Sequence, residues 1–151
     1  FALRVRDDIS KLSALVTSIR SVKEQLQARA KALEPRKTDP AVAELLKASD
    51  EVIKRIDTLE DRMHNPKAEV TYDILAERGG ARLYSRLSPL QMWAIEANGV
   101  PTAGMQAVLA EQEKELAAIE NETKQFIAGD IERINQRAQR LNLPFVIIKP
   151  Q

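Results

Sequence analysis

The fold is decided by residues 5–33, which read VRDDISKLSALVTSIRSVKEQLQARAKAL. Apolar residues recur there every seven positions, at Val5, Leu12, Ile19, Leu26 and Leu33. Residues with this spacing share one face of a helix, and the segment has no Gly or Pro to interrupt it. The stretch therefore predicts one amphipathic helix of about 30 residues, roughly 45 Å long at 1.5 Å per residue.

A short proline-containing turn separates this helix from a second one. The proline after Glu34 disfavours the helical conformation, so we expect the first helix to end there. Asp39, followed by another proline, has the pattern of a helix N-cap and first helical residue. Apolar periodicity then resumes and continues to about His64. Because the link is short, residues 4–64 are predicted to form an antiparallel helical hairpin.

The middle of the chain, residues 67–101, has a different composition, with glycines, prolines, both tyrosines and the only Trp. Short helices that cap one end of the bundle are predicted at 70–77, 81–87 and 88–97. The candidate interaction patch consists of Tyr72, Tyr84, Met92 and Trp93. We interpret these side chains as a plug for the open end of the bundle where the long helices diverge, with an exposed recognition surface as the rival hypothesis.

Residues 102–141 are predicted to form the longest helix, with a bend at Gly129. The apolar run 145–148 is too short and too β-branched for another helix, so we expect 143–151 to be an extended tail lying against the bundle. The sequence thus predicts a single all-α domain over residues 1–151. Its expected form is an elongated antiparallel bundle of three long helices with short helices capping one end.

The composition argues against most kinds of catalytic and metal site. The 151 residues include no Cys and one His, which excludes disulfides, thiolate nucleophiles and the usual multi-His metal sites. We interpret His64 as a favourable cation at a helix C-terminus rather than as a base. The acidic residues of the last helix are interpreted as its solvated face, namely Glu111, Glu113, Glu115, Glu120 and Glu122. No catalytic, cofactor-binding or metal-binding residue is therefore assigned.

The charges are nearly balanced, with 23 Lys and Arg against 22 Asp and Glu. A sequence-wide attraction to nucleic acid or anionic membrane is therefore not expected. The basic stripe Arg133, Arg137 and Arg140 is interpreted as cations favourable near a helix C-terminus, with nucleic-acid binding as a rival hypothesis. No apolar run approaches the roughly 20 residues of a membrane span.

The sign of the charges differs between the two arms of the hairpin. Residues 1–40 carry 9 basic and 5 acidic side chains, and residues 41–80 carry 6 and 9. We therefore predict that the first two helices are electrostatically complementary.

Four segments carry a resemblance to a known family. They read FALRVRDD at 1–8, IRSVKEQL at 19–26, HNPK at 64–67 and GGARLYSRLSPL at 79–90. Together they resemble the C-terminal helical region of large bacterial sortilin-like, BNR-repeat β-propeller proteins, which are often labelled glycosyl hydrolases. The resemblance implies that propellers precede this region in an exported parent, hence a secreted or periplasmic location. It implies no active site in these residues, and a start at Phe1 suggests an excised segment.

The function that we expect is that of a non-enzymatic C-terminal accessory or interaction domain, which packs on the N-terminal propeller part of its parent. A close variant is a self-associating coiled-coil module that forms a homo-oligomer. The alternative from another class is a glycoside hydrolase to whose shared active site this region contributes a carboxylate.

Overall fold

The computed structural model describes residues 1–65, 80–96 and 99–148. Within these ranges the chain is helical and contains no β-strand, which confirms the predicted all-α class. The elements are α1 (Ala2–Leu33), the 3-10 helix η1 (Glu34–Arg36), α2 (Pro40–Met63), α4 (Leu83–Glu96), α5 (Ala103–Phe126), the π-helical turn η2 (Ile127–Ile131) and α6 (Glu132–Arg140).

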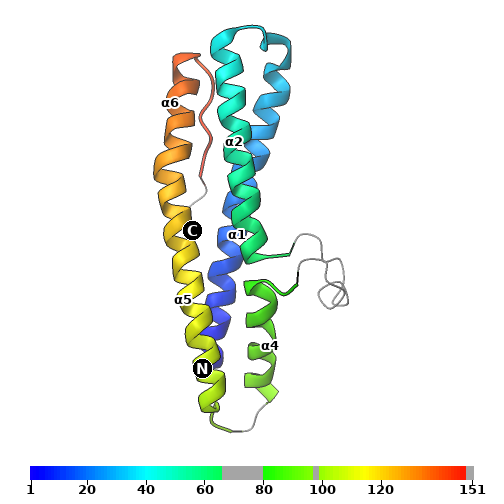
Figure 1. Ribbon diagram of the computed structural model, residues 1–151, viewed down its shortest axis with the longest axis vertical. Helices are drawn as coiled ribbons and strands as arrows, with labels where there is room; N and C mark the ends of the chain where they lie inside the picture. Colours follow the sequence, from blue (N-terminus) through cyan, green and yellow to red (C-terminus); the bar gives the residue numbers. More distant parts are fainter. Residues whose placement is uncertain (66–79, 97–98, 149–151) are drawn as a thin grey trace.

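The helices form an elongated bundle organised along α1 (Figure 1). α2 runs antiparallel to α1 beside its C-terminal half, and α4 follows nearly in the same line beside its N-terminal half. α5, η2 and α6 form one continuous rod of 38 residues on the remaining side. α1 therefore has a different helical neighbour along each half of its length.

The core follows the apolar seam of α1, which is buried as the seven-residue spacing predicted. Its exposed fractions are 4% or less at Val5, Leu12, Ile19, Leu26 and Leu33. Aliphatic side chains from α2, α4, α5, η2, α6 and the C-terminal tail belong to the same core cluster, together with the ring of Phe126. The bundle is thus held mainly by Leu, Ile and Val contacts.

The sequence predicted two short helices, at 81–87 and 88–97. The structure instead has one helix there, α4, with Pro89 inside it. A proline within a helix removes one backbone hydrogen bond and costs about 3 kcal/mol. Leu87 and Leu90, on either side of the proline, are fully buried. Burial of each leucine contributes about 1.5–3 kcal/mol, which is enough to keep the helix continuous.

The position of α4 also differs from the prediction that short helices cap one end of the bundle. α4 lies alongside α1 and α5, nearly in line with α2. Its buried residues form a stripe along its length rather than at its tip, at Leu83, Leu87 and Leu90. Such a stripe is satisfied by packing against parallel neighbours and not by closing an end. The predicted helix at 70–77 lies outside the described residues.

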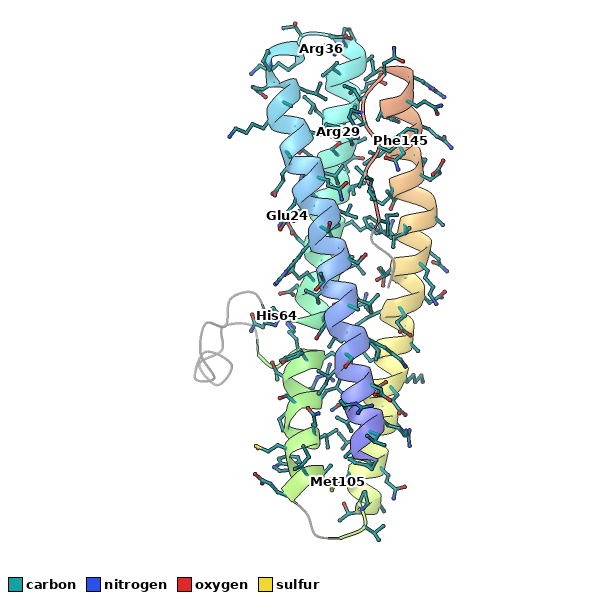
Figure 2. All side chains as sticks on the ribbon, turned by 180° about the vertical axis from the view of Figure 1, so that it is seen from behind. Glu24, Arg29, Arg36, His64, Met105 and Phe145 are labelled. Atoms are coloured by element: carbon teal, nitrogen blue, oxygen red, sulfur yellow. The ribbon has the colours of Figure 1, made fainter. Side chains whose placement is uncertain are left out.

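The π-helical turn η2 contains Gly129, where the sequence predicted a bend. On one side of this turn, α5 packs against α1 and α4; on the other side, α6 packs against α2. The chain then reverses after α6, and residues 143–148 lie between α6 and α1 (Figure 2). The predicted extended tail is therefore present as far as it is described, and it fills the space that α6 leaves beside α1.

Ion pairs join α1 to α2, as the opposite charge excess of the two segments predicted. Arg20 Nη2 lies 2.5 Å from Glu60 Oε1, and Lys23 Nζ lies 2.5 Å from Asp57 Oδ1. Glu60 is only 8% exposed, whereas the Asp57 side chain is half exposed. The first pair therefore compensates a carboxylate that is mostly withdrawn from water.

Asp8 is a second carboxylate with little access to water, at the α1 end that faces α5. Its residue is 6% exposed, and its Oδ2 atom has no hydrogen-bond partner. Burial raises the pKa of Asp8 above its ordinary value, and Glu113 adds to this, while Lys11, 3.5 Å away, opposes it. The charged form of Asp8 is thus disfavoured in the folded protein.

We predict that Arg20→Met lowers the free energy of unfolding by about 1–3 kcal/mol, because it leaves the Glu60 carboxylate without its charged partner. Adding Glu60→Gln recovers part of this loss, since a neutral amide is cheaper to bury. The control Lys23→Met breaks an exposed pair and costs less than about 1 kcal/mol. Chemical unfolding followed by circular dichroism measures all three, and equal losses for the two single variants would contradict the assignment.

We predict that Asp8→Asn raises the melting temperature at pH 7 and has little effect near pH 3. A folded-state pKa above the unfolded value means that the stabilising, protonated form is lost as the pH rises through the folded pKa. The amide carries no charge at either pH and escapes this loss. Melting curves across that pH range test this, with Asp7→Asn as the exposed neighbouring control. A pH-independent effect of Asp8→Asn would show that desolvation of the carboxylate is not the cause.

Candidate functional site

Exposed apolar side chains gather on α4 and just after it. Nine large apolar residues are exposed within the described ranges. Five of them lie between positions 84 and 100, namely Tyr84, Met92, Trp93, Ile95 and Val100. Met92 and Trp93 are more than half exposed, which does not fit our interpretation that they plug the end of the bundle and favours the rival hypothesis of an exposed surface. The outer surface of α4 is therefore the strongest candidate for contact with another molecule.

The helix distributes these side chains over two flanks. At about 100° per residue, Tyr84 and Ile95 point in nearly the same direction, whereas Trp93 points to the opposite flank. Met92 lies between the two directions. A shallow hollow on the first flank is lined by Ser88, Gln91, Met92, Ile95 and Glu96.

The structure thus brings together only part of the predicted interaction patch. Met92 lies between the two flanks of α4, whereas Tyr84 and Trp93 lie on opposite flanks. Tyr72 lies outside the described residues. Ile95, at 70% exposure, belongs to this surface and was missed by the sequence analysis. Its exposure follows from the helical periodicity only once α4 is known to be a single helix.

His64 lies at the junction of α2 and α4, as the C-cap of α2 (Figure 2). Its ring meets Tyr84 edge-on, with ring centroids 6.2 Å apart and an interplanar angle of 84°. His64 and Tyr84 line a second hollow, between α1 and the junction of α2 with α4. The hydroxyl-bearing side chains of Ser13 and Thr17 line it too. Each donates to a backbone carbonyl of its own helix at 2.9 Å, so neither is paired with the imidazole as an activated nucleophile would be.

The glutamates of α5 are only partly the solvated face that the sequence predicted. Three of them pair with arginines on three other helices: Glu113 with Arg4 of α1, Glu115 with Arg86 of α4, and Glu122 with Arg62 of α2. The hydrogen bond to Glu113 raises the pKa of Arg4 above its ordinary value. The prediction was wrong for these carboxylates because their partners are remote in sequence.

The basic stripe of the last helix is partly neutralised. Arg133 pairs with Asp130, which also accepts a hydrogen bond from Arg55 of α2 at 2.5 Å. These side chains line a groove between α2 and α6. Arg137 lies along this groove, and so does the acidic side chain of Glu51. A surface of alternating charge does not favour binding to a phosphate backbone.

In residues 1–65, 80–96 and 99–148, no group of three or more His, Asp or Glu side chains is placed to hold a metal ion. No helix in this part of the chain is long and apolar enough to cross a bilayer.

No protein-family model, curated protein or solved structure matches this chain.

Proposed function

We propose that this chain is a non-enzymatic helical interaction domain whose α4 outer surface binds a protein partner. The observation that carries the proposal is the concentration of exposed Met92, Trp93 and Ile95 on one helix. Aromatic residues and Met are enriched in protein interfaces, and Trp and Tyr are frequent among the few residues that carry most of the binding energy. The leucine stripe of α4 anchors this helix to α1 and α5, so the exposed side chains are presented on a rigid support.

The partner that we propose is the N-terminal propeller part of the parent protein. This rests on the resemblance to the C-terminal region of sortilin-like β-propeller proteins, which also supports a secreted or periplasmic location. A domain that packs on its neighbour buries part of its surface there, and α4 offers exposed apolar side chains along the side of the bundle.

The hydrolase alternative is less well supported by the site geometry. A glycosidase needs two carboxyl groups about 5–10 Å apart that are free to act on substrate. Glu113, Glu115 and Glu122 are instead engaged by arginines from neighbouring helices.

We predict that titration with the separately produced propeller part shifts the tryptophan emission of this chain to shorter wavelength. Trp93 is the only Trp of the chain, so after subtraction of the propeller's own signal the change reports on α4. Calorimetry should show that Met92→Ser and Ile95→Ser each weaken binding about tenfold or more. The matched control is Ile147→Ser, which changes a side chain of similar exposure, 69%, on the tail.

The absence of a shift, together with equal affinities for the α4 variants and the control, would contradict the proposed surface. Activity of the isolated chain on a panel of glycosides would instead support the hydrolase alternative.

A further inference from the structure

The C-terminal tail begins with a sharp reversal at the end of α6. The Leu143 N–H donates to the Ala138 carbonyl at 2.9 Å, and the Asn142 N–H donates to the Gln139 carbonyl at 3.0 Å. Asn142 has a φ of 54°, in the left-handed region where glycine is the usual residue. Pro144 favours an extended conformation for the residue before it, so the chain leaves the turn as a strand-like segment.

Two side-chain amides then hold the tail by its backbone. Asn135 of α6 accepts from the Val146 N–H at 2.8 Å and donates to the Val146 carbonyl at 3.1 Å. Gln25 of α1 accepts from the Ile147 N–H and donates to the Ile147 carbonyl, both at 2.8 Å. Each amide pairs with one residue as a neighbouring β-strand would, and the two amides lie on opposite edges of the tail.

The tail side chains alternate between the groove and solvent. Val146 is 5% exposed, whereas Phe145 and Ile147 are 53% and 69% exposed. Figure 2 shows Phe145 on the segment between α1 and α6. The α1–α6 groove thus recognises an extended backbone and one deeply buried apolar side chain.

These contacts do not require that the tail belong to the same molecule. The hydrogen bonds described for residues 144–148 come from α1 and α6, including a long one from Arg29 to the Pro144 carbonyl at 3.5 Å. The tail of a second copy would make the same bonds. The closed form, in which the tail lies in the groove of its own molecule, differs from the exchanged form at the reversal. In the closed form the reversal holds Asn142 in the left-handed conformation. Short strained hinges favour the exchange of segments between copies.

We propose that this chain forms a homodimer in which two copies exchange residues 143–148 between their α1–α6 grooves. Exchange opens the reversal. It replaces the Asn142 and Leu143 N–H bonds to α6 with bonds to water, and it relieves both copies of Asn142 of the left-handed conformation. The tail and α4 lie in opposite halves of the molecule (Figure 1), so a dimer joined through its tails leaves both α4 surfaces free. The dimer does not depend on what α4 binds.

The closed monomer competes strongly, because a tethered tail has an effective concentration of about 1 mM at its own groove. The unmodified chain is therefore expected to be mainly monomeric at low concentration and to dimerise as the concentration approaches that range. Asn142, the hinge residue, sets the equilibrium between the closed monomer and the exchanged dimer, so it is the position to substitute.

Two substitutions of Asn142 are expected to act in opposite directions. Asn142→Val penalises the left-handed conformation and should tighten dimerisation about 100-fold, since each of two hinges contributes about tenfold. Asn142→Gly adopts a positive φ without strain and should weaken dimerisation about tenfold. Light scattering across a concentration series, after warming to allow exchange, measures both constants.

The route of dimerisation is tested by labelling, which is simple because the chain has no Cys. One copy carries a donor on Phe145→Cys and the other carries an acceptor on Lys31→Cys, and energy transfer between copies is expected only when the tails cross. Gln25→Ala with Asn135→Ala should abolish the dimer, because the groove then holds neither its own tail nor the tail of a second copy. The matched control is Gln27→Ala with Gln139→Ala, which removes exposed amides of the same two helices.

Strictly monomeric behaviour of all hinge variants up to about 1 mM would overturn the proposal. Dimers without energy transfer, or dimers that Met92→Ser abolishes while the Gln25 and Asn135 changes do not, would also overturn it, because they place the contact on α4. Loss of partner binding by the α4 variants alone leaves the exchange intact, so the two proposals fail separately.

Discussion

The apolar seam of α1 is the constraint on which the other helices depend, since α2, α4 and α5 all pack against it. A seam from Val5 to Leu33 is longer than the 24 residues of α2, at 1.5 Å each, can cover. The uncovered part must be buried by another element, and α4 takes this place despite Pro89. At the other end, α6 packs on α2 and leaves the side of α1 open, which the tail fills. The unusual elements of the fold are therefore responses to one long apolar surface.

Burial alone does not define which helices are neighbours or in which register, because Leu, Ile and Val pack in many ways. Ion pairs between helices supply that information, with arginines of α1, α2 and α4 each reaching a different acidic side chain of α5 or η2. An exposed pair contributes less than about 1 kcal/mol, yet a shifted register would bring like charges together. The near-neutral balance of 23 basic and 22 acidic side chains therefore includes pairs that join the helices.

The sequence was sufficient for features that are local. Periodicity predicted the hairpin and the long last helix, and the Asp39 cap is present with a 3.0 Å bond to the Ala41 N–H. It was insufficient where burial overrides local preference, as at Pro89, or where partners are remote. In the sequence, Gln25 and Asn135 do not differ from ordinary solvated residues. Their role is visible only in the structure, which places the tail between them. For the candidate site, composition indicated the region, but the division of α4 into two flanks required knowing that it is one helix.

We expect α1 to unite the bundle into one cooperative unit, and native-state hydrogen exchange of the Ile19→Ala variant and of the unmodified chain measures this. Ile19 is 1% exposed, near the middle of the seam, so its truncation should cost about 2–5 kcal/mol. The slowest amides of α2, α4 and α5 should then lose protection by the same amount, because all of them open with α1. Loss confined to α2, with α4 and α5 unchanged, would contradict it.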